Sequence, residues 1–414
     1  MMYGCIGEHL SHSFSREIHT RLTDKYDYIL KEIPRGQLDA FMKSGSFQAI
    51  NVTIPYKQDV IPYLDVISPE AQKIGAVNTI VRRDGKLYGY NTDFLGMCGL
   101  LKRAGIEING KKILILGSGG TSKTANAVAK HLGAAEILTV SRHPEGDQID
   151  YETAISMHTD TQVIINTTPV GMYPKNGGCP IDIDLFPNLS GVLDAIYNPH
   201  RTNLITQAQK RGIPAEGGLY MLVAQAAYAA EKFLDTSIPE TEFERVYSAV
   251  RRQKANIVLV GMPGCGKSTV GRALAEKERR QFIDTDEEIT KKTGRTPDMI
   301  IRQDGVDAFR DIESQVIEEV SSLSSAVISI GGGGILRERN AQLLRMNGIL
   351  FFLDCPVDLL TVSDDRPLSS TRAALQQRYD ERIPIYRRHA DFIIDSDKNL
   401  ESNLKKIERE LEKI

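Results

Sequence analysis

Two glycine-rich loops constrain the possible fold of this chain most, because each stands between an apolar run and a helical pattern. The first loop, residues 117–122 (GSGGTS), directly follows the apolar run 113–116. The second loop, residues 261–269 (GMPGCGKST), directly follows the apolar run 257–260. A strand, a glycine-rich turn and a helix form a phosphate-binding unit, since the backbone amides at the helix N-terminus face the anion. The sequence therefore predicts two separate α/β phosphate-binding units.

Length, charge and cysteine usage narrow the class of protein. A chain of 414 residues is too long for a typical single core, so we expect two or three domains. The net charge of -3 argues against a nucleic-acid or anionic membrane surface, and no apolar run is long enough to span a bilayer. The five cysteines include no CxxC pair, which favours a reduced, cytoplasmic protein without disulfides or a zinc site.

From residue 96 to about 220, short strands that alternate with helical patterns predict a doubly wound, parallel α/β sheet. Residues 1–95 alternate short apolar runs with helical patterns, and the chain after about 252 repeats the strand–helix alternation. We expect a catalytic lobe in residues 1–95 together with about 220–250, and a nucleotide-binding lobe in residues 96–219. A polar helix is expected over residues 240–254, and we place the main domain boundary there, near residue 252. Residues 252–414 are therefore expected to form a further α/β domain. Whether the chain forms a homo-oligomer is left open.

The first loop is typical of dinucleotide binding, although Gly-x-Gly-Gly alone is a weak signal. The next expected strand ends at Ser141-Arg142, and Arg142 stands 25 positions after Gly117. An acid at this place would hold the ribose hydroxyls of NAD, whereas arginine suits the 2′-phosphate of NADP. A solvated surface arginine is the alternative, and the acidic stretch 144–147 (PEGD) leaves the use of NAD open.

Further motifs around this loop resemble the shikimate dehydrogenase family over about the first 250 residues. They are residues 12–15 (HSFS), 51–57 (NVTIPYK), 75–79 (GAVNT), 91–93 (NTD), 166–172 (NTTPVGM) and 217–226 (GGLYMLVAQA). The resemblance implies a two-lobed α/β unit with a Rossmann NADP lobe. It also implies the reduction of 3-dehydroshikimate to shikimate with NADPH.

The same resemblance implies residue roles. Lys57 and Asp93 form the catalytic pair, since a lysine steadied by a carboxylate can protonate a developing alkoxide. The implied substrate-binding residues are Ser13, Ser15, Thr53, Asn78, Asp93, Tyr197 and Gln225. The implied NADP-binding residues are Gly117, Ser118, Gly119, Gly120, Thr121, Ser141, Arg142 and Gly218. Taken singly, the serines and Asp93 are also consistent with helix caps, and Lys57 with a surface lysine.

The second loop is a P-loop, in which backbone amides surround the phosphates of ATP. Lys267 is expected to reach the β- and γ-phosphates, and Ser268 to bind Mg²⁺. Asp284 follows the next expected strand and is placed to act on Mg²⁺ through water. The expected ATP-binding residues of this loop are Gly264, Cys265, Gly266, Lys267, Ser268 and Thr269.

Residues after the P-loop resemble the shikimate kinase family across about 252–414, with a nucleoside-monophosphate-kinase-like α/β fold. The resemblance implies that Asp286 orients an acceptor hydroxyl, and that Arg310, Gly332 and Arg382 bind the carboxylate of shikimate. Arg366 is expected to reach the ATP phosphates from a lid that is short and acidic for the family. Arg310 and Glu313 are expected on one face of a helix beginning at Phe309, where a simple ion pair is the alternative.

The sequence thus predicts a bifunctional enzyme that makes shikimate and phosphorylates it. Its small-molecule substrates would be 3-dehydroshikimate and shikimate, and its cofactors NADP(H), ATP and Mg²⁺. One alternative is a shikimate or quinate dehydrogenase. In that alternative the P-loop domain, of low activity, would act as a nucleotide sensor.

Overall fold

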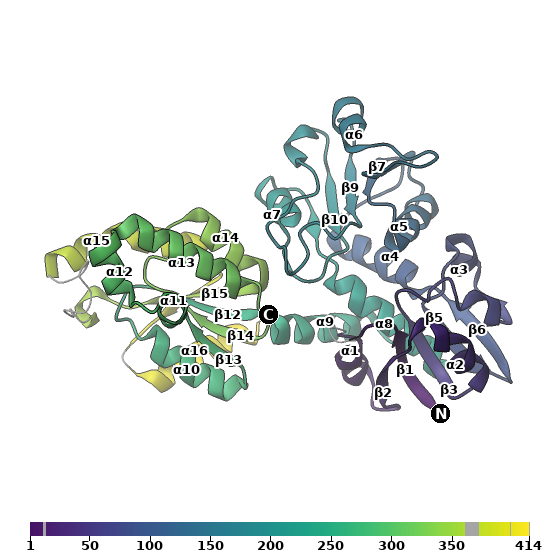
Figure 1. Cartoon of the computed structure of the whole chain (residues 1–414), viewed down its shortest axis with the longest axis horizontal. Coiled ribbons are helices and arrows are strands. Elements are labelled where there is room, and N and C mark those ends of the chain that lie inside the picture. The colour runs from purple at the N-terminus through teal and green to yellow at the C-terminus, as the bar shows by residue number, and fades with distance from the viewer. Residues whose placement is uncertain (11–13, 361–371, 398, 414) are drawn as a thin grey trace. The chain divides into compact units, whose positions relative to one another are not determined.

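The computed structural model describes residues 1–10, 14–360, 372–397 and 399–413 (Figure 1). The chain divides into two compact units, Met1–Val250 and Arg251–Ile414, which are described separately here. Within the described residues, no helix combines the length and the apolar character that crossing a membrane requires.

The first sheet of unit 1 has six strands in the order β2-β1-β3-β5-β6-β4. Strands β1, β2 and β3 are parallel, whereas β5 runs antiparallel to β3 and to β6. Asp84 and Gly85 join β5 to β6 with φ angles of 50° and 76°, as a two-residue hairpin turn requires. The strands are β1 (Met2–Gly7), β2 (Tyr28–Glu32), β3 (Phe47–Val52), β4 (Val66–Ile67), β5 (Thr79–Arg83) and β6 (Lys86–Tyr90).

Helices cover both faces of this sheet. Phe41 of one helix packs with Phe47 and Ile50 in one core, and Phe233 of another packs with Tyr28 and Ala49 in a second core. The alternation of strand side chains between the two faces accounts for the two cores. These helices are α1 (Ser15–Leu22), α2 (Leu38–Ser44), α3 (Pro69–Ile74) and α8 (Leu219–Leu234).

The second sheet of unit 1 has five parallel strands in the order β11-β10-β9-β7-β8. The first glycine-rich loop follows β7, where the strand order reverses, which is the usual ligand position in such sheets. The strands are β7 (Lys112–Leu116), β8 (Glu136–Val140), β9 (Val163–Asn166), β10 (Gly191–Asp194) and β11 (Ala215–Glu216). The associated helices are α4 (Thr92–Ala104), α5 (Gly120–His131), α6 (Tyr151–Met157), α7 (Asn203–Lys210) and α9 (Glu240–Lys254).

Unit 2 is built on five parallel strands in the order β13-β14-β12-β15-β16. They are β12 (Asn256–Val260), β13 (Gln281–Asp284), β14 (Ala326–Ser329), β15 (Gly348–Asp354) and β16 (Phe392–Asp395). Every residue of β12 and β14 is buried, as expected for central strands that helices cover on both faces. The helices are α10 (Lys267–Glu278), α11 (Thr285–Thr293), α12 (Pro297–Asp304), α13 (Val306–Ser321), α14 (Glu338–Asn347), α15 (Arg372–His389) and α16 (Leu400–Leu411).

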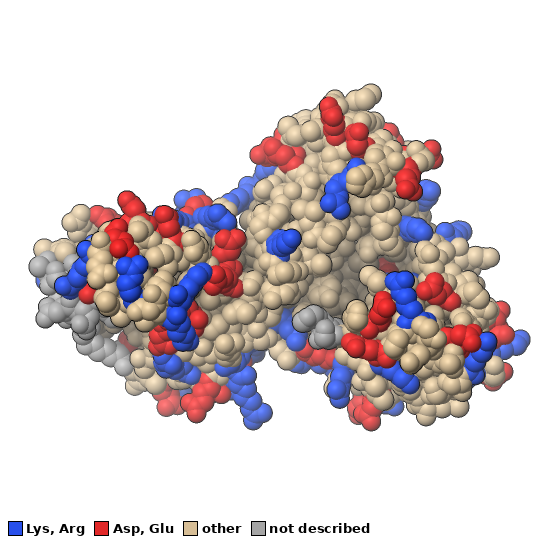
Figure 2. All heavy atoms as spheres, in the orientation of Figure 1, with Lys and Arg blue, Asp and Glu red and all other residues tan. Residues whose placement is uncertain are grey.

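The predicted α/β folds are confirmed, including the parallel sheet expected in residues 96–220. The sheet of residues 1–95 is mixed because of the β5–β6 hairpin. One helix start differs from the expectation. Helix α13 begins at Val306 rather than at Phe309, since Gly305 (φ 90°) ends the preceding helix and opens this one. On the face drawn in Figure 2, basic and acidic side chains are interspersed over each unit, in line with the small net charge.

Candidate active sites

Lys57 and Asp93 form an ion pair in unit 1, with the Lys57 Nζ 2.6 Å from the Asp93 Oδ2. Lys57 lies in the turn that follows β3, and its backbone carbonyl accepts a hydrogen bond from the Val77 amide at 2.8 Å. Asp93 lies in the first turn of α4, and Asn91 caps that helix by accepting from the Phe94 amide at 3.2 Å. Asp93 is therefore not the cap. The side chains of Lys57 and Asp93 are 31% and 17% exposed, so the pair is shielded but reachable by a ligand.

Asn78 is held rigidly next to this pair. Its Oδ1 accepts hydrogen bonds from the Thr92 amide at 2.7 Å and from the Thr79 hydroxyl at 3.0 Å. Because hydrogen bonds within the protein already occupy the Asn78 Oδ1, the side-chain NH₂ is the group that Asn78 can offer to a substrate. Thr53, also predicted to bind substrate, follows β3 and donates its backbone amide to the Ile6 carbonyl at 2.9 Å.

A buried network behind Asn78 was missed by the sequence reasoning. The Tyr28 hydroxyl donates to Asn51 Oδ1 at 2.7 Å, and Asn51 Nδ2 donates to the Asn78 carbonyl at 3.2 Å and to Thr79 Oγ1 at 3.1 Å. Asn51 is only 7% exposed on a strand that is otherwise almost wholly apolar. A buried amide in such a strand requires partners, and that is the signal that could have identified it.

The N-terminal part of α1 contributes to the same region. Ser15 is the first residue of α1 and lies beside the Tyr28 side chain. Phe14 occupies the cap position, so Ser15 is a helix residue rather than a cap. The Phe14 ring meets the Tyr197 ring edge-on, with centroids 5.3 Å apart. Ser13 lies outside the described residues.

Gln225 approaches the pair from α8. A Cβ on Gly96, one turn after Asp93, would lie 3.0 Å from the Gln225 Cβ, so glycine is what permits this close approach. Gln225 Nε2 donates to the Leu222 carbonyl of its own helix at 2.9 Å. Of the substrate-binding candidates, Asn78 and Gln225 therefore contact the first turns of α4 directly.

The first glycine-rich loop leaves the start of α5 accessible. Gly117 has a φ of 103°, and a Cβ there would lie 2.9 Å from the Thr167 hydroxyl. By contrast, a Cβ on Gly119 or Gly120 would meet no atom within 4 Å. No side chain caps α5, so the amides of its first turn, which includes Thr121, are available to a phosphate.

Of the remaining NADP candidates, Ser141 and Arg142 lie beside this loop, whereas Gly218 packs against the chain that follows β10. Ser118 and Ser141 approach each other with their hydroxyl oxygens 3.4 Å apart, and Arg142 is exposed. Gly218 is packed tightly, since a Cβ there would lie 2.2 Å from the Ala195 carbonyl oxygen. An exposed guanidinium beside an uncapped helix start fits a phosphorylated dinucleotide.

A second buried network joins the ends of β9 and β10. Asp194 accepts hydrogen bonds from Asn166 Nδ2 at 3.0 Å, the Ile196 amide at 3.0 Å and the Thr202 hydroxyl at 2.7 Å. Burial raises the pKa of Asp194 to about 6, against the lowering effect of these donors. The network fixes the chain next to Tyr197, and its buried acid was not identified from the sequence.

In unit 2 the P-loop joins β12 to α10. Lys267 is buried, and its Nζ donates to the carbonyls of Gly261 and Met262 at 3.0 Å each. Gly266 has a φ of 90°, a conformation that favours glycine. The other predicted ATP-binding residues in this loop and the first turn of α10 are Gly264, Cys265, Ser268 and Thr269. Arg366 lies outside the described residues.

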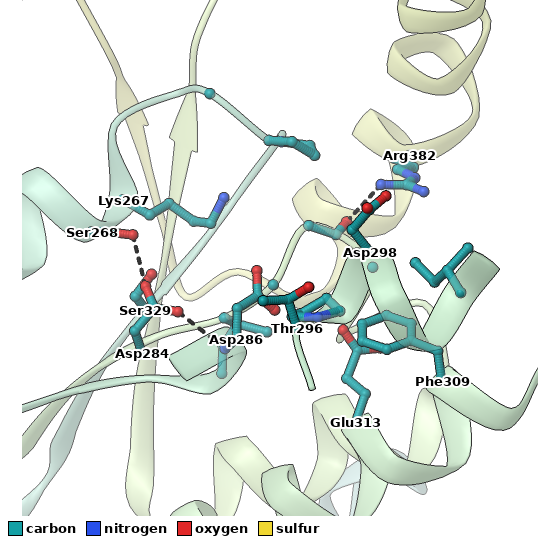
Figure 3. A pocket seen from close by; sticks show the side chains of 18 of the residues that line it. Lys267, Ser268, Asp284, Asp286, Thr296, Asp298, Phe309, Glu313, Ser329 and Arg382 are labelled. Carbon is teal, nitrogen blue, oxygen red and sulfur yellow. Dashed lines mark hydrogen bonds between the residues drawn. The ribbon is translucent and has the colours of Figure 1, made fainter. Parts of the chain in front are cut away.

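Ser268 and Asp284 face each other at the end of the P-loop (Figure 3). The Ser268 hydroxyl donates to Asp284 Oδ2 at 2.7 Å, and Asp284 Oδ1 accepts from the Asp286 amide at 3.0 Å. Hydroxyl and carboxylate oxygens are the donor set that Mg²⁺ prefers, so these residues fit a magnesium ion bound with nucleotide phosphates.

Arg310 lies on α13 and pairs with Glu313 on the same face of that helix. Glu313 is buried, and burial raises its pKa while the Arg310 guanidinium opposes that rise. A Cβ on Gly333 would lie 2.0 Å from a guanidinium nitrogen of Arg310, so the third glycine of the run 331–334 permits this placement.

Arg382 meets the same glycine run from α15. Its Nη1 donates to the Gly332 carbonyl at 2.9 Å, and the Tyr386 hydroxyl donates to the same oxygen. Tyr386 is a residue that the sequence reasoning missed, although its spacing of four from Arg382 places both on one helix face.

These groups enclose one cavity of about 750 Å³ (Figure 3). Its lining includes the P-loop lysine, the carboxylates and the two arginines predicted from the sequence, namely Lys267, Ser268, Asp284, Asp286, Arg310, Gly332 and Arg382. A single space therefore gives access both to groups that suit a nucleotide phosphate and to groups that suit a carboxylate.

Comparisons with known proteins agree with this division. A family model described as shikimate dehydrogenase substrate binding domain matches residues 5–80, and one described as shikimate kinase matches residues 263–412. The shikimate dehydrogenase (NADP(+)) of Clostridium beijerinckii is 39% identical over 260 residues, which cover 59% of this chain and 96% of that protein. That of Halothermothrix orenii is 38% identical over 258 residues, covering 55% and 88%.

Solved structures show the same relationship. A chorismate mutase/shikimate 5-dehydrogenase fusion protein from Clostridium acetobutylicum is 37% identical, with a TM-score of 0.58 over 60% of this chain and 96% of that one. Shikimate 5-dehydrogenase from Thermus thermophilus, in complex with NADP(H) and shikimate, is 27% identical, with a TM-score of 0.55 over 60% and 99%. The chain thus belongs to the shikimate dehydrogenase family and carries a shikimate kinase domain in its C-terminal unit.

Proposed function

We propose that this bifunctional shikimate-pathway enzyme reduces 3-dehydroshikimate to shikimate with NADPH and phosphorylates shikimate to shikimate 3-phosphate with ATP and Mg²⁺. The observation that carries the proposal is the pairing of two sites in one chain. The Lys57–Asp93 ion pair at 2.6 Å serves a carbonyl reduction. The cavity lined by Lys267, Arg310 and Arg382 serves phosphoryl transfer to an acceptor that carries a carboxylate.

In the first reaction, Lys57 would deliver a proton to the carbonyl oxygen as negative charge develops there. Asp93 would hold the Lys57 amine in position, because its Oδ2 accepts a hydrogen bond from the Lys57 Nζ at 2.6 Å. When bound, NADPH supplies the hydride that adds to the carbonyl carbon. The amide of Asn78 and the hydroxyls of Ser15 and Thr53 would bind the substrate's hydroxyls.

The cofactor would lie against the start of α5, with its 2′-phosphate at Arg142. A relative from Listeria monocytogenes was solved with shikimate and NAD. Because Arg142 is followed by acidic residues, the ratio of kcat/KM for NADPH to that for NADH tests this assignment directly. We expect NADPH to be favoured in the wild type and the ratio to fall in Arg142→Ala.

In the second reaction, Asp286 would orient the 3-hydroxyl of shikimate for in-line attack. Lys267 would neutralise the transferring phosphoryl group, and Ser268 and Asp284 would hold the magnesium ion that binds ATP. Arg310 and Arg382 would hold the carboxylate of the acceptor. No covalent intermediate is needed, since positioning and charge neutralisation account for most of this catalysis.

One coupled assay tests the whole proposal. The purified chain is given 3-dehydroshikimate, NADPH and Mg-ATP, and shikimate 3-phosphate is measured. We expect shikimate to accumulate when ATP is omitted and shikimate 3-phosphate to form when ATP is present. Consumption of NADPH with no ADP release would contradict the kinase function and favour the nucleotide-sensor alternative. Competition between shikimate and quinate in the reverse reaction separates the two dehydrogenase alternatives.

A further inference from the structure

The cavity of unit 2 contains a guanidinium that neither sequence motif assigns. Arg378 lies on α15 and lines the cavity together with Arg310 and Arg382. Residues four apart on an α-helix lie on the same face, about 6 Å apart along its axis. Arg378 and Arg382 therefore point into the same space from successive turns of α15.

Arg378 differs from the other two arginines because it has no partner among the described residues. Arg310 pairs with Glu313, and Arg382 donates to the Gly332 carbonyl. Arg378, only partly exposed, makes no hydrogen bond or ion pair with any residue that the structure describes. Its hydrogen-bond donors are therefore available to a ligand.

The charges around Arg378 also favour an anion. Burial lowers the pKa of Arg378, and repulsion from Arg382 and Arg310 lowers it further, while Glu381 opposes the shift. Glu381 is exposed and accepts a hydrogen bond from Gln377 at 2.9 Å, so it offsets this repulsion only in part. Like charges in a cavity that excludes part of the solvent raise each other's energy, and a bound anion removes that cost.

We propose that Arg378 is a third cationic ligand for the carboxylate of the acceptor, and that it makes this site select an anionic over a neutral acceptor. The inference rests on the proposed kinase function. The Arg310–Glu313 pair is neutral as a whole, and Asp298 is a further acidic residue of the lining, so the second positive charge among Arg378 and Arg382 is what leaves this lining with a cation for the acceptor. Arg378 binds and positions the acceptor and takes no part in proton transfer.

The first test compares Arg378→Gln with the wild-type chain by measuring ADP release at varied shikimate and Mg-ATP. We expect the KM for shikimate to rise about tenfold, as for the loss of a hydrogen bond to a charged group. The kcat and the KM for ATP should change less than about twofold, since neither depends on ground-state contacts to the carboxylate. Arg378→Lys should restore part of the affinity. Arg388→Gln removes the same charge from an exposed position of the same helix and should change nothing.

The second test uses the methyl ester of shikimate as a neutral acceptor. The ratio of kcat/KM for the acid to that for the ester should fall about tenfold in Arg378→Gln, since only the acid loses an ionic contact. An unchanged KM for shikimate, or an equal loss for acid and ester, would overturn the inference. If the wild-type chain itself releases no ADP with shikimate, the proposed kinase function fails and the inference falls with it. That result is distinct from an active wild type with an equally active Arg378→Gln.

Discussion

The two candidate sites differ in the kind of group that they present to a small polar acid. The site in unit 1 presents amides and hydroxyls that are fixed from behind by buried hydrogen bonds, as Asn78 is by Thr79 and Thr92. The site in unit 2 presents cations, among them Lys267 and Arg382, around a run of glycine backbone. The first arrangement recognises the positions of hydroxyls, whereas the second recognises charge. Disturbing geometry should therefore impair the first site most, and removing charge the second.

The largest expected effect is that of Lys57→Ala on the reductase reaction. Loss of the proton donor should lower kcat for reduction about 10³-fold or more, within the range for a general acid. ADP release with shikimate should stay at the wild-type rate, because Lys57 belongs to unit 1. Lys25→Ala, at an exposed position of the same unit, is the matched control. Loss of both activities in a folded Lys57→Ala protein would contradict the independence of the two sites.

The converse substitution is Asp286→Asn. We expect kcat for phosphorylation to fall about 10²-fold, a smaller loss because positioning and charge neutralisation carry most of phosphoryl transfer. Reduction of 3-dehydroshikimate, followed by NADPH absorbance, should be unaffected. The exposed Asp307→Asn on α13 controls for the charge change. Phosphorylation at the wild-type rate would remove Asp286 from the proposed mechanism.

The sequence predicts the parts of both sites that depend on local pattern. The apolar runs 113–116 and 257–260 appear as strands β7 (Lys112–Leu116) and β12 (Asn256–Val260), and the glycine-rich loops follow them as expected. The ion pair of Arg310 with Glu313 follows from helical spacing alone. These features rest on residues near one another in the chain, where periodicity carries the information.

The supporting networks could not be predicted, because they depend on strand order. In the sheet register, Tyr28 of β2 lies opposite Tyr3 of β1, and Asn51 of β3 lies opposite Cys5 of β1. Strand β1 therefore lies between the two strands that carry Tyr28 and Asn51. No local pattern reveals that a tyrosine and an asparagine from separate strands meet across a third. Arg378 was missed for a related reason, since only the cavity distinguishes it from a surface arginine. The β5–β6 hairpin was also missed, although Asp84-Gly85 is a local turn signal that could have identified it.

A third prediction concerns stability in unit 1. The raised pKa of Asp194, about 6, means that the folded protein keeps this proton at a pH where the unfolded chain has released it. The stabilisation is complete below about pH 4 and is lost as pH rises to about 6, with a total of about 2–3 kcal/mol. The difference in melting temperature between wild type and Asp194→Asn should therefore change with pH across that window. The measurement is calorimetry of the unit 1 transition, and a difference that stays constant from pH 4 to pH 7 would contradict the expected proton uptake.

The smallest expected effect tests whether geometry limits the first site. Tyr28→Phe removes the hydroxyl that donates to Asn51 and leaves the ring in place. The loss of one buried hydrogen bond costs about 1 kcal/mol, and since Asn51 in turn holds Asn78, we expect the KM for 3-dehydroshikimate to rise about fivefold. Tyr63→Phe removes a hydroxyl that donates to exposed Asp39 and is the matched control. ADP release should not change in either variant. A Tyr28→Phe enzyme that loses stability but keeps its KM would show that the network supports the fold without positioning Asn78. The contrast between recognition by geometry in unit 1 and recognition by charge in unit 2 would then depend only on the residues that contact the substrate.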